Sequence, residues 1–151
     1  MAYKKVVVAG NPKYKEAKAN AAITPGHLVE RMSTGNVRVH ATGGGSCQKM
    51  FAIEDSGRGK TIDDAYEAAQ QAQLAICQPG DEIYALLYNG EHAYKHSLLE
   101  SQGDGTLRVV DADASWGAIA LNSIVGEALE EVDMSGSSGE DPSARILIEI
   151  W

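Results

Sequence analysis

The chain has 151 residues, of which 44% are hydrophobic and 23% charged, a composition typical of a globular domain and not of a disordered segment. Its net charge of -8 argues against a protein that coats nucleic acid, because such proteins are basic. The charge is unevenly distributed. Residues 1–18 contain five lysines and one glutamate, a net charge of +4, which leaves -12 for the rest of the chain.

The first 22 residues are predicted to form an extended basic arm, followed by a single β-rich domain over residues 23–151. In the arm, residues 3–9 have the composition of a strand and end at a Gly-Asn-Pro turn, whereas residues 13–22 have little apolar surface to bury. Strands are predicted next at 27–32, 36–40 and 49–54, with a hairpin loop over 33–35.

One short helix is predicted to begin after Thr61, because Asp64 completes a capping box and several alanines follow. Residues 68–76 fit either the end of this helix or a strand. The remaining predicted features are a buried strand over 82–88, a hairpin turn at Asn89-Gly90, a second hairpin over 97–110, a bulge or bend at Gly126 and a final strand over 145–151. About eight short strands separated by turns predict a mainly β fold, a small barrel or sandwich.

Two cysteines, Cys47 and Cys77, are too few for a disulfide framework and lack a C-x-x-C spacing. We therefore expect reduced thiols in an intracellular setting. No apolar run approaches the ~18 residues of a membrane span, and residues 6–9 are too short for the core of a signal peptide. The sequence predicts a soluble, unprocessed protein with no membrane partner.

Two segments resemble known ligand loops but lack required residues. The Gly-Lys-Thr at 59–61 would need a glycine where Glu54 stands to form a phosphate-binding loop, and a carboxylate there would repel phosphate. The acidic run at 111–115 would need a glycine and a glutamate where Trp116 and Asn122 stand to form a calcium loop. A turn before a helix cap and a solvated acidic turn explain these segments better.

His92 and His96 are four residues apart and could share a metal if they lay on a helix, but they lie in a strand-rich region. No nucleophile elbow or other local signature supports a catalytic triad. We therefore predict no catalytic, metal-binding or cofactor-binding residues and no enzymatic activity.

The N-terminal arm is the remaining candidate binding element. Its lysines alternate with aromatic and β-branched residues, a pattern suited to a strand that joins the edge of a partner's sheet. An ordinary edge strand of the protein's own sheet explains the pattern equally well, because solvated lysines discourage aggregation. The candidate binding residues are Tyr3, Lys4, Lys5, Val6, Val7, Val8, Lys13, Tyr14 and Lys15.

Several segments, in order, resemble the capsid decoration (cement) proteins of tailed bacteriophages. They are AITPGHLV at 22–29, GKTIDDAY at 59–66, PGDEIYALL at 79–87, NGE at 89–91, SLLESQGDGTLRVV at 97–110, SIVGEALEEVDMSGSSG at 123–139 and RILIEI at 145–150. The resemblance covers residues 20–151, and the order of the motifs is its specific part.

The resemblance implies a tulip-like small β-barrel or β-sandwich that is made in the host cytoplasm and binds the outer surface of the expanded capsid. Such proteins commonly bind as homotrimers and join neighbouring major capsid protein subunits against the pressure of packaged DNA. Here the basic arm would contact the capsid. The alternatives are a phage tail or head-completion structural protein, and a small-molecule-binding β-barrel or hydrolase. A deep pocket holding polar groups with perturbed pKa values would favour the last alternative, and a solid aliphatic interior would argue against it.

Overall fold

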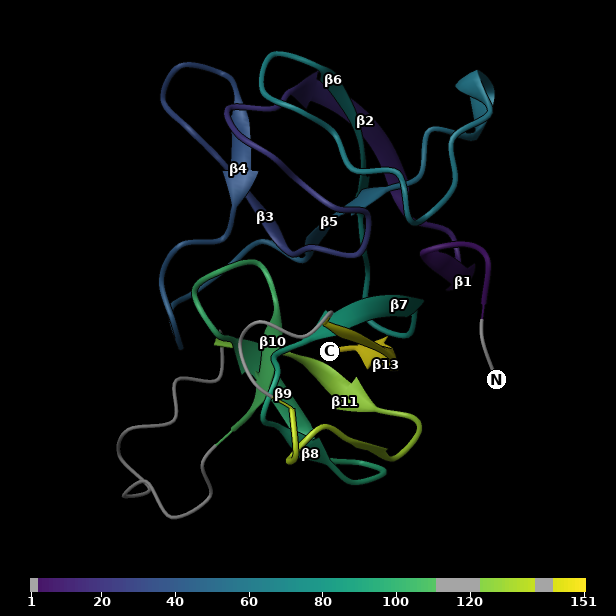
Figure 1. The fold of residues 1–151 in the computed structure, drawn as a ribbon, viewed down its shortest axis with the longest axis vertical. Coiled ribbons are helices and arrows are strands. Elements are labelled where there is room, and N and C mark those ends of the chain that lie inside the picture. Colours follow the sequence, from purple (N-terminus) through teal and green to yellow (C-terminus); the bar gives the residue numbers. More distant parts are fainter. Residues whose placement is uncertain (1–2, 111–122, 138–142) are drawn as a thin grey trace.

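The fold is a closed β-barrel with a smaller β-layer packed against one end (Figure 1). The computed structural model describes residues 3–110, 123–137 and 143–151. Strands form nearly all of the regular structure in these residues, and the helical structure there is one short 3₁₀ turn, η1 (Ser56–Arg58). The mainly β class and the small barrel predicted from the sequence are confirmed. No helix in the described residues is long and apolar enough to cross a membrane.

Five strands close the barrel, and the last of them pairs with the first. Their order is β7 (Glu82–Leu87), β10 (Leu107–Val109), β9 (Leu98–Ser101), β11 (Ile124–Ala128) and β13 (Ala144–Ile150). The closing pair is antiparallel and long, running from Ala144 opposite Leu87 to Glu149 opposite Glu82. A sheet closed in this way satisfies backbone groups that an open sheet would leave at its edges.

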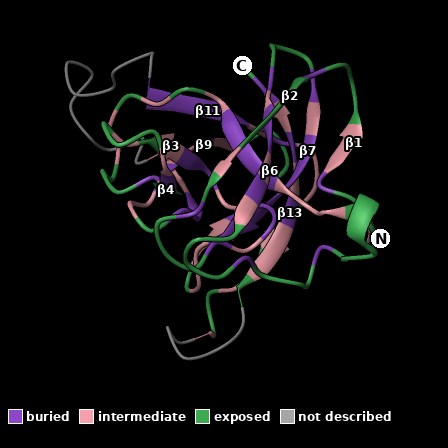
Figure 2. Ribbon diagram, turned by 90° about the horizontal axis from the view of Figure 1, so that it is seen from above, coloured by how far each residue is buried: buried purple, intermediate pink, exposed green. Residues whose placement is uncertain are grey.

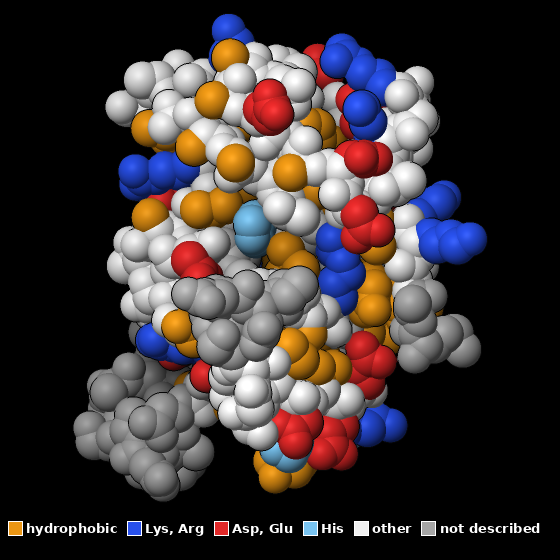
Figure 3. Space-filling view, in the orientation of Figure 1, with side chains coloured by type: hydrophobic (Ala, Val, Ile, Leu, Met, Phe, Trp, Pro, Cys, Tyr) orange, Lys and Arg blue, Asp and Glu red, His pale blue; other side chains and the backbone are white. Residues whose placement is uncertain are grey.

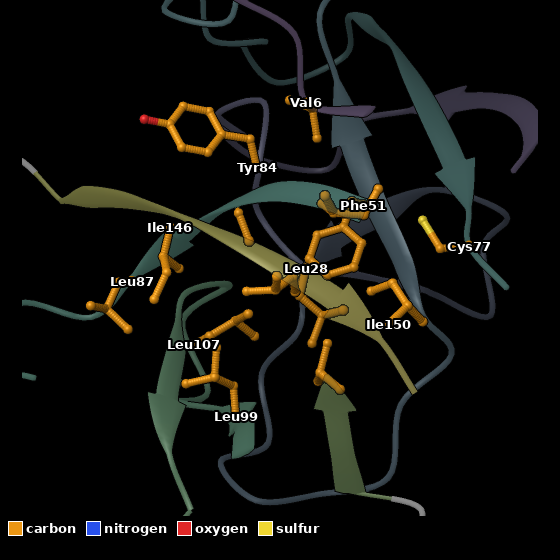
Figure 4. Packing of buried hydrophobic residues seen from close by; sticks show 14 of the residues in the cluster. Val6, Leu28, Phe51, Cys77, Tyr84, Leu87, Leu99, Leu107, Ile146 and Ile150 are labelled. Atoms are coloured by element: carbon orange, nitrogen blue, oxygen red, sulfur yellow. The ribbon is translucent and has the colours of Figure 1, made fainter. Parts of the chain in front are cut away.

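Aliphatic side chains fill the interior of the barrel. On the five barrel strands, the members of this cluster with at most 2% of their surface exposed are Ile83, Ala85, Leu87, Leu99, Leu107, Val125, Ala128, Ile146, Ile148 and Ile150. Figure 4 shows the Phe51 ring at the centre of this packing and Tyr84 at its margin, with the Tyr84 hydroxyl directed away from the cluster. This solid aliphatic interior is the condition that we expected to argue against a barrel with an internal ligand chamber.

Gly126 marks an irregularity in the barrel, as predicted. The pairing between β11 and β9 shifts register between Ile124 and Gly126. A β-carbon at position 126 would overlap the carbonyl oxygen of Glu149 on β13. Glycine therefore allows β11 and β13 to approach closely at this point.

The second layer contains a three-stranded sheet and a hairpin. The sheet has the order β2 (Lys13–Lys18), β6 (Gln71–Ile76) and β5 (Met50–Ile53), and the hairpin joins β3 (Val29–Arg31) to β4 (Val37–Val39). The two faces of β5 serve different cores: Phe51 packs in the barrel cluster, whereas Met50 and Ala52 pack in a second cluster toward the hairpin. Figure 2 shows a buried segment of β6 in the middle of the molecule, with exposed turns around the periphery.

The hairpin predictions are confirmed in two of three cases. β3 pairs with β4 and β9 pairs with β10, both antiparallel, as expected from the loops predicted at 33–35 and 101–105. The prediction at Asn89-Gly90 is wrong. Gly90 does occupy a left-handed turn with φ 96, but β7 pairs with β13, and β8 (His92–Ala93) pairs with β12 (Val132–Asp133).

The helix predicted from Thr61 is absent from the structure, although its capping interaction forms: the backbone N–H of Thr61 donates to the Asp64 carboxylate at 2.7 Å. The chain then leaves the turn because Tyr66 forms a β-bridge with Ile23. The open question over residues 68–76 is also answered. A turn with Ala69 at φ 70 precedes β6, so this segment is a strand from residue 71.

Candidate functional site

The N-terminal residues lie in two strands of the protein's own sheets in place of a free arm. β1 (Val7–Ala9) pairs with β7, and the backbone N–H of Tyr84 donates to the carbonyl of Val6 at 2.7 Å. Val6 is fully buried in the barrel cluster, and Val7 and Val8 are partly buried against it. Of the two interpretations of this segment, the structure has the edge strand that belongs to the protein itself.

β2 carries the exposed part of the basic segment. All six of its residues pair with β6 on one side, and the sheet order leaves β2 at the edge of its sheet. The side chains of Lys13, Lys15 and Lys18 are exposed, and Tyr14 has 59% of its surface exposed. This strand therefore presents positive charge, an exposed aromatic ring and an open strand edge. We call it the β2 edge.

A hollow of about 600 Å³ adjoins the N-terminal segment. Three distant parts of the chain meet there: residues 3–5, the loop at 54–63, and the side chains of Tyr84 on β7 and Arg145 on β13. The rings of Tyr3 and Tyr84 form an edge-to-face pair with centroids 5.2 Å apart. We call this concavity the tyrosine hollow.

Arg145 is the most constrained polar side chain of the tyrosine hollow. Its Nη2 donates to the carbonyl of Ile62 at 2.7 Å, and its guanidinium carbon lies 5.9 Å from the centroid of the Tyr84 ring. Burial lowers the pKa of Arg145, and the charge of Asp63 opposes this effect. The Nη1 atom is buried without a hydrogen-bond partner in the described residues, an arrangement that costs about 1–3 kcal/mol.

Gly26 provides the space for this guanidinium. A β-carbon at position 26 would lie 2.5 Å from Nη1 of Arg145, and the backbone there has φ +100. The Pro-Gly turn recognised in the sequence therefore has a structural role at the hollow, because it combines a left-handed conformation with a close approach to Arg145.

A second hollow of about 450 Å³ lies beside the first and includes Val7, Tyr14 and Gln73. The two hollows share Lys5, Glu54 and Ser56 in their walls. The Glu54 carboxylate accepts a hydrogen bond from the backbone N–H of Val6 at 3.0 Å, which ties the N-terminal segment to the end of β5. The two concavities thus adjoin each other at Lys5, Glu54 and Ser56.

The structure brings together some of the nine predicted binding residues and separates others. Tyr3, Lys4 and Lys5 line the tyrosine hollow, and Val7 and Tyr14 line the second one. The remaining residues lie in neither hollow: Val6, Val8, Lys13 and Lys15. The sequence prediction missed Ile62, Tyr84 and Arg145. Arg145 lies at the start of a strand with a regular alternation, and no local signal distinguishes it from an ordinary strand residue.

The other sequence patterns do not form sites in the described residues. The acidic run at 111–115 lies outside these residues. His92 lies 2.8 Å from Glu131 and stacks on Tyr94 with ring centroids 4.1 Å apart, whereas His96 lies 3.7 Å from Glu127. In the described part of the chain, no three His, Cys, Asp or Glu side chains are grouped so that they could hold a metal ion. Acidic side chains surround a histidine at the end of the barrel near β8 (Figure 3).

A buried histidine–serine pair joins the two layers. His40 Nδ1 lies 2.7 Å from Ser101 Oγ, and its Nε2 lies 3.2 Å from the carbonyl oxygen of Ser46. Since a carbonyl only accepts, Nε2 carries the proton and Nδ1 accepts from the serine hydroxyl. Ser101 is 0% exposed, so a substrate cannot reach it. The pair is a structural link between β4 and β9.

No protein-family model matches the sequence, and no match is found among curated proteins. Among solved structures, the chain is similar to the head fiber gp8.5 N base of bacteriophage phi29, with a TM-score of 0.55 and 12% sequence identity. The similarity covers 92% of this chain and 93% of that chain. It therefore describes the whole architecture, barrel and second layer together, and at this identity it shows a common fold.

Proposed function

We propose that this chain is a structural protein of a phage virion, which binds the outer surface of the expanded capsid and cements neighbouring major capsid protein subunits. The observation that carries the proposal is the fold similarity, over 92% of the chain, to a head fiber protein of a bacteriophage. The order of sequence motifs that resembles decoration proteins supports the same class. The proposed partner is the major capsid protein, which a homotrimer of this chain contacts.

The proposed role is mechanical and requires no catalytic step. A protein that binds the expanded lattice more tightly than any other state stabilises that lattice by mass action. Many copies that act together convert a modest affinity at each site into a large stabilisation of the shell. The chain therefore needs a binding surface and a rigid body, and the closed barrel with its solid interior provides the second.

The β2 edge is the binding surface that we propose for the capsid. Its three exposed lysines are a local excess of positive charge on an acidic protein, which favours approach to a negatively charged partner. Its unpaired edge can receive an additional strand, and Tyr14 offers apolar contact beside it. Positive charge, an exposed aromatic ring and an open strand edge are also the properties expected of the basic arm. Here they belong to β2, a strand of the protein's own sheet.

Point substitutions test this surface better than truncation does. Removal of residues 1–20 would delete β1, β2 and the buried Val6, so loss of binding could result from unfolding. The combined substitutions Lys13→Glu and Lys15→Glu change exposed side chains only. The matched control is Arg31→Glu with Lys95→Glu, which changes the net charge equally and is also exposed.

Binding to expanded capsids of the phage that encodes the chain is measured by cosedimentation at about 0.1 M salt. We expect wild-type protein and the control to decorate the capsids, and the β2 variant to bind at least about tenfold more weakly, a difference of ~1.4 kcal/mol. Wild-type protein that fails to bind expanded capsids contradicts the proposed function. A β2 variant that binds as well as the control contradicts the assignment of the surface.

A further inference from the structure

We propose that the tyrosine hollow is a binding site for an extended peptide segment that presents a carboxylate side chain beside an apolar one. The source of this segment is the capsid lattice, and that part of the proposal rests on the function proposed above. The chemistry of the site is independent of it, since it follows from the charges and rings around the hollow.

The charge around the hollow favours a carboxylate. Four cationic side chains line it, against two carboxylates, although the whole chain is acidic; the cations are Lys4, Lys5, Lys60 and Arg145. Of the two carboxylates, Glu54 already accepts a hydrogen bond from the backbone of Val6. In the described residues no carboxylate lies within 4.0 Å of the Arg145 guanidinium as an ion-pair partner. The site therefore has positive charge that the chain itself does not neutralise.

The walls of the hollow favour an apolar side chain next to that carboxylate. The edge-to-face pair of Tyr3 and Tyr84 forms one side, and Ile62 lies in the adjoining loop. Rings of this kind contribute contact area beside a polar hydroxyl group. Figure 4 shows the Tyr84 hydroxyl pointing away from the core, and the backbone of Tyr3 is its hydrogen-bond partner.

The shape of the site favours an extended peptide over a compact small molecule. The hollow adjoins the second concavity at Lys5, Glu54 and Ser56, so that the two lie next to each other between the N-terminal segment and the loop that follows β5. Side chains two residues apart in an extended chain lie on the same face, roughly 7 Å from each other. An extended peptide with an acidic and an apolar residue two positions apart can therefore direct both kinds of side chain toward the adjoining hollows.

The test uses full-length protein and three blocked hexapeptides with charged and apolar residues two positions apart: acidic ESLSES, neutral QSLSQS and basic KSLSKS. Binding is followed by ¹H–¹⁵N NMR titration of the backbone amides at low salt. We expect ESLSES to bind at least about tenfold more tightly than QSLSQS, KSLSKS to bind least, and the shifted amides to include Tyr3, Lys5 and Ile62. Equal affinity for the three peptides, or shifts located elsewhere, overturns the proposal.

Two sets of substitutions separate the site from general charge effects. Lys5→Gln with Lys60→Gln removes two exposed cations at the hollow, and Arg31→Gln with Lys95→Gln removes two exposed cations elsewhere. The first variant should lose the preference for ESLSES, and the second should keep it. Both variants change exposed side chains, so their unfolding temperatures should match that of the wild type. A hollow variant that keeps the full preference overturns the proposal.

The same variants on expanded capsids distinguish this proposal from the proposed function. If the hollow variant and its control bind expanded capsids equally well, the occupant of the hollow does not come from the capsid. The proposed function is unaffected by this result. If the protein prefers the acidic peptide but does not bind capsids, the proposed peptide site is supported and the proposed function is contradicted. Self-association of the free protein that the hollow variant abolishes would identify a second copy as the occupant and overturn the capsid source.

Discussion

We expect protonation of His27 to destabilise the protein at acidic pH. A substitution of His27 should remove this part of the pH dependence. Its Nδ1 atom accepts a hydrogen bond from the backbone N–H of Thr24 at 3.1 Å, so the neutral ring fits the fold. Burial lowers the pKa of His27 from 6.5 to about 4; the charge of Asp104 opposes this change, and that of Arg145 adds to it. Stability from the neutral ring is present above pH 6.5 and is lost as the pH falls toward 4.

The magnitude follows from the difference between the two pKa values. Each unit is worth about 1.4 kcal/mol, so the free energy of unfolding should fall by about 2 kcal/mol between neutral pH and about pH 4.5, and by about 3 kcal/mol at lower pH. The assay is urea unfolding across this range for the wild type and for His27→Asn. Asparagine keeps an acceptor near the Thr24 N–H and does not titrate.

The carboxylates titrate in both proteins. The difference between the two pH profiles of the unfolding free energy therefore reports the contribution of His27. We expect the wild type to lose about 2 kcal/mol more than His27→Asn between neutral pH and about pH 4.5. Parallel pH profiles for the two proteins would refute the reasoning, because they would show that His27 titrates equally in the folded and unfolded states.

Three further predictions concern the core. Gly126→Ala should lower the free energy of unfolding by about 1–3 kcal/mol or more, since its β-carbon would overlap the Glu149 carbonyl, whereas Gly136→Ala, with open space around it, should have little effect. Burial, together with the charge of Asp81, raises the pKa of Cys77 to about 12, so iodoacetamide at about pH 8 should alkylate it at least ~100-fold more slowly in folded than in urea-unfolded protein. His40→Ala should cost about 1–3 kcal/mol, because the Ser101 O–H loses its acceptor in the core while its oxygen still accepts from the Gly103 N–H.

Each of these predictions can fail in a specific way. Equal stability of the two glycine variants would contradict the close approach of β11 and β13. Alkylation of Cys77 at the same rate in folded and unfolded protein would contradict its burial. A His40→Ala variant with wild-type stability in urea would contradict the buried link between the layers.

Turn and capping signals in the sequence predicted the local conformation of the chain. They could not predict which distant segments pair with each other as strands. Gln102 to Gly105 contains the turn glycines of the β9–β10 hairpin, so the sequence was sufficient there. Asn89-Gly90 is an equally strong turn signal, yet β7 pairs with β13 about sixty residues later because the barrel must close. The capping box at Thr61 likewise forms but does not lead to a helix, since the Tyr66–Ile23 bridge determines the path of the chain.

The candidate site likewise combines residues that the composition indicated with residues that only the fold brings together. The basic composition of residues 3–18 indicated a segment that borders two hollows, and Tyr3, Lys5 and Tyr14 line them. Composition could not show that Val6 packs in the barrel core, because that depends on pairing with β7. Nor could it bring Arg145, from the opposite end of the chain, against Tyr84 and the Ile62 carbonyl.

The most direct test of the central proposal is to locate and count this chain in purified virions by cryo-electron microscopy, with quantitative mass spectrometry of the same particles. The proposed function predicts hundreds of copies at regular positions on the outer surface of the head, with the β2 edge against the major capsid protein. A few copies at a vertex or in the tail, or none in the virion, would contradict it.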